Sequence, residues 1–163
     1  MQFIDLSKQQ KLIREKINAR IESVLDHGQY INGKEVFELE DLLANYVDKK
    51  YCISCSSGTD ALLIPLMAYG IGPGDAVITT PFTYIATAEV IAILGATPIF
   101  IDIYEKTFNI DPDGIEEAVI FAKKQNLVPK AIIPVDLFGL PSRYRLINDV
   151  AKKHNLAVIE DFA

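Results

Sequence analysis

The sequence predicts an α/β fold, in which a largely parallel sheet lies between two layers of helices as three-layer α/β/α. Two observations indicate this fold. From about residue 50 onward, short apolar runs alternate with helical stretches, as in crossover units that join parallel strands. The runs at 98–103 and 131–137 are rich in β-branched residues and apolar on both parities, as expected of strands buried on both faces. Half of the 163 residues are hydrophobic and 23% are charged, which excludes a disordered chain.

Two helices are predicted to precede the alternating region. The first covers 7–27, where apolar residues recur at three-to-four spacing, and Gly28 supplies a stop signal. The second is expected to end near 48–50, and its apolar face consists of Val36, Leu39, Leu42, Leu43 and Tyr46. We therefore expect an N-terminal helical segment, 1–49, followed by an alternating β/α part, 50–163.

The alternating part is expected to contain five strands and four helices. The strand candidates are the short apolar runs at 51–55, 76–79, 98–103, 131–137 and 157–161. The helix candidates lie between these runs, at 59–69, 83–94, 112–125 and 141–154. Loops rich in glycine, proline and aspartate punctuate the two kinds of segment, as at 70–74 and 111–114.

Composition excludes several classes of protein. The net charge is -6 with a pI near 4.9 and no basic cluster, so a nucleic-acid partner is not expected. The longest apolar stretch, 90–101, is interrupted by Gly95 and Pro98 and is too short to span a bilayer. The N-terminus lacks the apolar core of a secretion signal. We expect a cytoplasmic protein with no membrane partner.

The two cysteines, Cys52 and Cys55, have a spacing that is found in redox pairs and zinc sites. A redox pair places its first thiolate at a helix N-terminus, whereas Cys52 lies in an apolar, strand-like run. A zinc site of four sulfurs needs a second pair, which the sequence lacks. We therefore expect buried core thiols and no metal site.

Residues that follow parallel strands converge on the carboxyl edge of the sheet. The first run is followed by small and hydroxyl residues at 54–60, where a helix is expected to begin. Free N–H groups and the helix dipole bind an anion such as phosphate at such a place, although Ser57 or Thr59 can equally be only an N-cap. After the second run, Phe82 and Tyr84 offer a flat face to a ring, or they are ordinary packing residues.

The fifth run ends in Glu160 and Asp161. A carboxylate beneath a ligand can hold a proton or a cationic ring nitrogen, and it can also serve as a helix cap or a metal ligand. An anion cradle, a flat face and a carboxylate together match a phosphorylated, cationic, aromatic ligand. Pyridoxal 5′-phosphate has all three properties.

Three segments carry a resemblance to a known family: residues 56–103, KAIIPVDLFG at 130–139 and AVIEDFA at 157–163. They resemble the N-terminal half of the large domain of the DegT/DnrJ/EryC1/StrS family, fold-type I aminotransferases that use pyridoxal phosphate and act on nucleotide-linked keto sugars. The resemblance extends from Phe3 to Ala163. It implies transfer of an amino group from glutamate to a keto group of a nucleotide-linked sugar, such as a UDP-2-acetamido-3-keto-uronic acid, for surface polysaccharide synthesis.

The resemblance also implies roles for individual residues. Gly58 and Thr59 would hold the cofactor phosphate, Tyr84 would stack on the pyridine ring, and Asp161 would pair with the pyridine nitrogen. A carboxylate in that place keeps the nitrogen protonated, which makes the ring an electron sink. The remaining implied contact concerns GQYINGKEV, which resembles a loop near the sugar nucleotide, often across a dimer interface. Its contact residues would be Gln29 and Tyr30.

The chain departs from the family pattern in several places. The Schiff-base lysine of the family lies well downstream of Asp161, so we expect a truncated chain that is inactive alone. Asp136 stands where relatives often carry His or another polar residue, and neither His27 nor His154 is expected to be catalytic. The lysines are expected on solvated faces rather than at the site: Lys49, Lys50, Lys123, Lys124, Lys152 and Lys153.

Two other interpretations stay open at this point. The family includes a dehydratase variant with histidine in place of the lysine, and that position is missing here. The chain could instead be a non-catalytic product that exposes apolar surface and associates with a missing C-terminal half. For the complete protein, the resemblance implies a homodimer with a nucleotide sugar and an amino-acid donor as its small-molecule partners.

Overall fold

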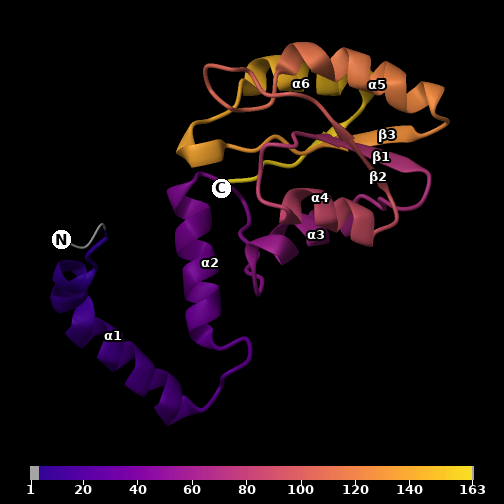
Figure 1. Ribbon diagram of the computed structural model, residues 1–163. Coiled ribbons are helices and arrows are strands. Elements are labelled where there is room, and N and C mark those ends of the chain that lie inside the picture. Colours follow the sequence, from indigo (N-terminus) through magenta and orange to yellow (C-terminus); the bar gives the residue numbers. More distant parts are fainter. Residues whose placement is uncertain (1–3, 163) are drawn as a thin grey trace. The chain divides into compact units, whose positions relative to one another are not determined.

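The computed structural model describes residues 4–162. The chain forms two compact units, Met1–Ser54 and Cys55–Ala163 (Figure 1). Phe3 and Ala163, the two ends of the resemblance, lie outside the described residues. None of the helices within 4–162 combines the length and the apolar character that a membrane span requires.

The first unit contains the two expected helices, α1 (Ser7–His27) and α2 (Lys34–Tyr46). Gly28 ends α1 in the left-handed conformation, with φ 66°, and its N–H donates to the Val24 carbonyl oxygen at 2.9 Å. Glycine adopts this conformation without the Cβ penalty of other residues, which is why the stop signal in the sequence was accurate.

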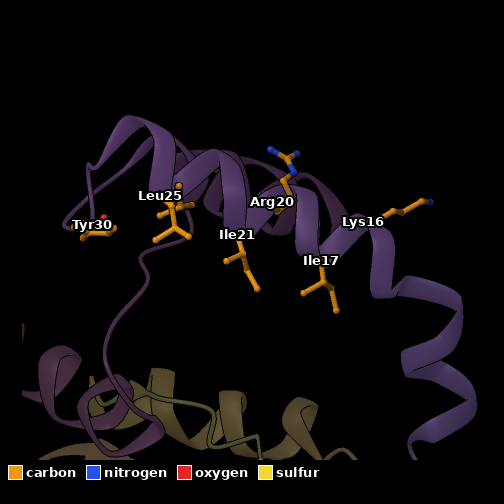
Figure 2. Close-up of a pocket in the computed structure, with 7 residues that line it drawn as sticks. Lys16, Ile17, Arg20, Ile21, Leu25 and Tyr30 are labelled. Carbon is orange, nitrogen blue, oxygen red and sulfur yellow. The ribbon is translucent and has the colours of Figure 1, made fainter.

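An apolar stripe on α1 is exposed along its whole length. Ile17, Ile21 and Leu25 are 41%, 53% and 60% exposed, and no residue of α1 is buried. Figure 2 shows these three side chains projecting from the same side of the helix, with Tyr30 following them. The periodicity in the sequence therefore predicted a helix correctly, although within the described residues nothing buries its apolar face.

The segment 51–55 does not form the strand that was expected. A strand needs a neighbour to accept and donate its backbone hydrogen bonds, and residues 4–162 offer this segment no strand partner. Instead, the Ser54 N–H and hydroxyl both donate to Oε1 of Glu40 at 2.7 Å. β-propensity alone was not sufficient to make a strand here.

The expectation of buried cysteines is also wrong. Cys52 is half-buried and Cys55 is exposed. The Cys55 thiol donates to the carbonyl oxygen of Ser57 at 3.3 Å. The expectation depended on a strand at 51–55, and without that strand the two thiols do not enter a core.

The second unit is built on a parallel sheet with the order β2-β1-β3-β4. Its strands are β1 (Asp75–Thr79), β2 (Thr97–Phe100), β3 (Val128–Ile132) and β4 (Ala157–Val158). β1 is buried along all of its residues because it lies between β2 and β3. Beyond the short β4, a further parallel bridge joins Val135 to Asp161.

Helices cover both faces of the sheet, which confirms the three-layer arrangement (Figure 1). The helices are α3 (Gly58–Ala68), α4 (Ala86–Ile93), α5 (Ile115–Lys124) and α6 (Tyr144–His154), with 3-10 turns η1 (Pro112–Gly114) and η2 (Leu137–Gly139). Successive residues of β1 enter opposite cores, because strand side chains alternate. Val77 packs in the core with α3 and α4, and Ile78 packs in the core with α5 and α6.

One strand is less buried than its sequence suggested. The run at 98–103 was expected to be buried on both faces, but β2 is the edge strand and Phe100 is 50% exposed. The run at 131–137 is buried as expected, with Ala131 and Ile132 fully buried, but the strand itself covers Val128–Ile132 and ends earlier than predicted. Proline can be accommodated in β3 because the register against β1 shifts where Pro129 would otherwise need an N–H.

Two helices begin later than the sequence indicated. The stretch 83–94 becomes helical only at Ala86, because the preceding residues form a turn in which the Phe82 N–H donates to Thr80 Oγ1 at 3.2 Å. The stretch 141–154 becomes helical only at Tyr144, because the Ser142 N–H donates to Oδ1 of Asp136 at 2.8 Å. Both loops lie at the carboxyl edge of the sheet.

Candidate active site

The first turn of α3 presents free backbone donors. Ser57 is the N-cap, and its Oγ accepts the Asp60 N–H at 3.1 Å, which resolves the alternative of Thr59 as the cap. The N–H groups of Gly58 and Thr59 have no acceptor among residues 4–162, as is general for the first turn of a helix. A Cβ placed on Gly58 would meet nothing within 4 Å, so the space beside this glycine is open.

This turn lies toward the carboxyl edge of the sheet. At the far end of α3, the Gly70 carbonyl oxygen accepts a hydrogen bond from Lys130 Nζ at 3.1 Å, and Lys130 also pairs with Asp75 at the start of β1 at 2.9 Å. The last turn of α3 is therefore at the amino edge. A helix of 11 residues rises about 16 Å, which is roughly the length of a five-residue strand, so its first turn reaches the opposite edge.

Asp161 lies at the same carboxyl edge and is held by its backbone and its side chain. Its N–H donates to the Pro134 carbonyl oxygen at 3.0 Å, and its carbonyl oxygen accepts the Asp136 N–H at 2.9 Å. The hydroxyl of Thr87 donates to Oδ2 of Asp161 at 2.7 Å. The carboxylate is half-buried, and its other oxygen, Oδ1, receives no hydrogen bond from residues 4–162.

The loop between β1 and α4 carries two aromatic residues with different surroundings. Phe82 packs against Phe108 with ring centroids 5.7 Å apart, and it is still 45% exposed. Tyr84 is 75% exposed, which leaves its ring available to a ligand. The loop joins α4 at Ala86, immediately before Thr87, the residue that bonds to Asp161.

Asp136 is a structural carboxylate and also contains an unpaired oxygen. It is fully buried, and its Oδ1 accepts the Ser142 N–H at 2.8 Å and the Tyr144 hydroxyl at 2.9 Å. Burial, followed by the hydrogen bond to Asp136, raises the pKa of the Tyr144 phenol. Within the described residues, Oδ2 of Asp136 has no partner. Asp136 contacts the candidate site mainly through its backbone N–H, which donates to the carbonyl oxygen of Asp161.

Gln29 and Tyr30 belong to the first unit. The Gln29 N–H donates to Nδ1 of His27 at 3.0 Å, and its side-chain amide donates to the Asn32 carbonyl oxygen at 3.2 Å. Tyr30 is 68% exposed. Their predicted contact with a sugar nucleotide remains a prediction.

The lysines expected on solvated faces are exposed: Lys49, Lys50, Lys123, Lys124, Lys152 and Lys153. Lys50 lies over the ring of Tyr51, with Nζ 4.9 Å from its centroid. Lys153 pairs with Glu116 at 3.0 Å. The four lysines of this set in the second unit lie in helices α5 and α6 and do not follow a strand at the carboxyl edge, so none of the four lies beside Asp161.

Both histidines pair with glutamates. Nε2 of His27 lies 3.2 Å from Oε1 of Glu35, and Nε2 of His154 lies 2.9 Å from Oε2 of Glu116. Hydrogen bonds from His154 and Lys153 lower the pKa of the Glu116 carboxyl. These pairs satisfy the imidazoles locally, and the expectation that neither is catalytic stays a prediction.

Comparison with known proteins identifies the family. The profile of the DegT/DnrJ/EryC1/StrS aminotransferase family matches residues 11–163. The chain belongs to this family. The DegT/DnrJ/EryC1/StrS resemblance inferred from the three sequence segments is therefore confirmed.

Two curated members of the DegT/DnrJ/EryC1/StrS family illustrate the similarity. A UDP-2-acetamido-2-deoxy-3-oxo-D-glucuronate aminotransferase of Pseudomonas aeruginosa is 53% identical over 163 residues, which are 100% of this chain and 44% of that protein. A UDP-N-acetyl-3-dehydro-alpha-D-glucosamine 3-aminotransferase of Acidithiobacillus ferrooxidans is 41% identical over 161 residues, 99% of this chain and 42% of that protein. The chain thus spans less than half the length of these relatives.

Solved structures of the DegT/DnrJ/EryC1/StrS family agree with the fold. A DegT DnrJ EryC1 StrS aminotransferase from Brucella abortus has a TM-score of 0.95 and 46% identity, covering 98% of this chain and 43% of that chain. NtdA from Bacillus subtilis with bound cofactor PMP has a TM-score of 0.83 and 39% identity, covering 90% of this chain and 32% of that chain. The expected fold class, the α/β fold of the fold-type I transferase large domain, is confirmed.

Proposed function

We propose that the carboxyl edge of the sheet binds pyridoxal 5′-phosphate. The residues present fit this group: the first turn of α3 offers two free N–H donors, Tyr84 offers an exposed ring, and Asp161 offers a carboxylate oxygen. The observation that carries the proposal is Asp161, a half-buried carboxylate whose Oδ2 is held by Thr87 while Oδ1 is left for a ligand. A relative with 39% identity, NtdA, has PMP bound, which supports the same group here.

Each residue has a separate task in this proposal. Gly58 and Thr59 donate their N–H groups to the phosphate, where the positive end of the α3 dipole favours an anion. Tyr84 packs against the pyridine ring, and Asp161 accepts a hydrogen bond from the protonated pyridine nitrogen, which keeps the proton on that nitrogen. When bound, the cofactor supplies the electron sink that amino transfer requires.

We further propose the reaction of the whole protein. It transfers an amino group from an amino-acid donor, glutamate, to the keto group of a nucleotide-linked sugar. The 53% identity to an aminotransferase of UDP-2-acetamido-2-deoxy-3-oxo-D-glucuronate supports a UDP-linked 3-keto uronic acid as the acceptor. A polypeptide that extends to the length of the relatives should aminate this acceptor with glutamate, and accumulation of 2-oxoglutarate measures the reaction.

Binding of the cofactor can be tested on the 163-residue chain itself. Pyridoxamine 5′-phosphate is the suitable probe, because it binds without a covalent bond to lysine. Calorimetric titration should give one site per chain, and Tyr84→Ala should raise the dissociation constant about three- to tenfold, since aromatic stacking contributes roughly 0.5–1.5 kcal/mol.

A second tyrosine provides the matched control. Tyr69 is 59% exposed but follows the last turn of α3, at the amino edge of the sheet. Tyr69→Ala should leave the dissociation constant unchanged. An absence of binding to the unaltered chain, or an equal effect of the two alanine substitutions, would contradict the assignment of the site.

We also propose that the complete protein forms a homodimer through the apolar stripe of α1. The stripe consists of Ile17, Ile21 and Leu25, and together with Tyr30 it borders a shallow hollow of ≈ 570 Å³ (Figure 2). Exposed apolar surface of this kind commonly marks an interface. Light scattering should report a dimer, and Ile21→Glu should shift it to monomers. Leu12→Glu alters an exposed leucine outside the stripe and should leave the dimer intact. The same oligomeric state for the two variants would refute a dimer interface on this stripe of α1.

A further inference from the structure

A chain of hydroxyl groups leads to Asp161 from the turn that carries Tyr84. Oγ1 of Thr83 lies 3.0 Å from Oγ1 of Thr87, and Oγ1 of Thr87 lies 2.7 Å from Oδ2 of Asp161. Thr87 is 1% exposed, so its hydroxyl has no access to bulk water. The three side chains come from the β1–α4 loop, the first turn of α4 and the end of the sheet.

The direction of these hydrogen bonds follows from counting protons. An ionised carboxylate only accepts hydrogen bonds, and a threonine hydroxyl has one proton to donate. Because the Thr87 hydroxyl donates its hydrogen bond to Asp161, it must accept the hydrogen bond that Thr83 donates. The hydroxyl groups therefore form a hydrogen-bond chain with one direction, from Thr83 to Thr87 to Asp161, in which both protons point toward the carboxylate.

The contact of Thr87 is unusual for a threonine in a helix. Such a hydroxyl commonly bonds to the carbonyl oxygen four residues earlier, which for Thr87, the second residue of α4, belongs to Thr83 before the helix. Here the hydroxyl bonds instead to a carboxylate 74 residues away in the sequence. The bond locks Oδ2 of Asp161 and so determines which way Oδ1 faces.

We infer that Thr87 is a positioning residue that orients the Asp161 carboxylate toward the pyridine nitrogen of the cofactor, and that Thr83 orients Thr87. This inference rests on the proposed function. Neither threonine needs to touch the cofactor. Tyr84 lies between them in the sequence, so the same turn aligns the ring-stacking residue and the carboxylate that pairs with the ring nitrogen.

The test compares substitutions of Thr87 with a matched control. Thr87→Val removes the hydroxyl at constant shape and should raise the dissociation constant of pyridoxamine 5′-phosphate about tenfold, the lower end of the effect of a hydrogen bond to a charged group. Thr87→Ser keeps the hydroxyl and should restore binding to within about twofold of the original value. Thr79→Val removes another buried hydroxyl, which donates to the Ile133 carbonyl oxygen at 2.8 Å, and should not change binding.

A spectroscopic measurement separates positioning from a general loss of structure. With the pyridine nitrogen of the probe labelled with ¹⁵N, its chemical shift reports protonation in the complex. Thr87→Val should lower the pH midpoint of this titration by about one unit, which corresponds to the tenfold change above. Thr79→Val should leave the midpoint unchanged.

A double-mutant cycle distinguishes this inference from the proposed function. In an Asp161→Asn background, Thr87→Val should have no further effect on binding, because Thr87 acts through the carboxylate. If Asp161→Asn weakens binding but Thr87→Val does not, the positioning role is overturned and the site stands. If the unaltered chain does not bind the probe, or Asp161→Asn does not weaken binding, the proposed site is wrong and the positioning role falls with it.

Discussion

Asp161→Asn is expected to abolish most of the amino transfer catalysed by a polypeptide that extends to the length of the relatives. Asparagine keeps the size of the side chain and can still accept from Thr87, but it carries no charge with which to keep the pyridine nitrogen protonated. Loss of one preorganised electrostatic group typically lowers kcat by about 10²- to 10³-fold. Steady-state kinetics with glutamate and the keto sugar should therefore show a lower kcat.

Asp136→Asn provides the comparison for this substitution. Asp136 is also a carboxylate at the carboxyl edge, but its Oδ1 is engaged by the Ser142 N–H and the Tyr144 hydroxyl. We expect its replacement mainly to reduce thermal stability, with only a minor effect on kcat. Retention of full activity by Asp161→Asn would remove the basis for the proposed function, whatever the behaviour of Asp136→Asn.

Ile78→Ala is expected to cause a large loss of stability. Ile78 is fully buried in β1, where it pairs in register with Ile99 of β2 and Ile132 of β3. Truncation of such a side chain leaves a cavity and costs about 2–5 kcal/mol. Urea denaturation should show a lower midpoint with an unchanged slope.

Ile120 supplies the surface control, since it is 46% exposed on α5. Ile120→Ala should change the free energy of unfolding by less than about 0.5 kcal/mol. Similar losses for the two isoleucines would mean that the core between the sheet and the α5–α6 layer is not packed as described.

The sequence was sufficient for features that depend on local periodicity. The spacing of isoleucines predicted α1 with its observed bounds, whereas the strand expected at 131–137 overlaps β3 only at residues 131–132. It failed where a neighbour decides the outcome. Residues 51–55 have the composition of a strand but no strand to pair with in the described residues, and β2 is exposed because it lies at the sheet edge.

The candidate site was predictable to the same extent. Convergence of the strand ends pointed to the loops at 54–60 and 82–84 and to the run that ends in Asp161. The family resemblance then assigned the individual roles, which stay predictions. Thr87 was missed, because the partner of its hydroxyl is distant in the sequence and no local pattern reveals it. The one signal in the sequence was the spacing of four between Thr83 and Thr87, which places two hydroxyl groups on one face of a helical turn.

The bare apolar stripe of α1 has a practical consequence for following assembly. Most helical stability in proteins comes from tertiary packing of an amphipathic face, and none of the residues of α1 is buried. Hydrogen exchange of the α1 amides should therefore be fast whenever the stripe is uncovered and slow whenever something packs on it. The hydrogen-exchange rate of the α1 amides thus reports assembly without a label or a substrate.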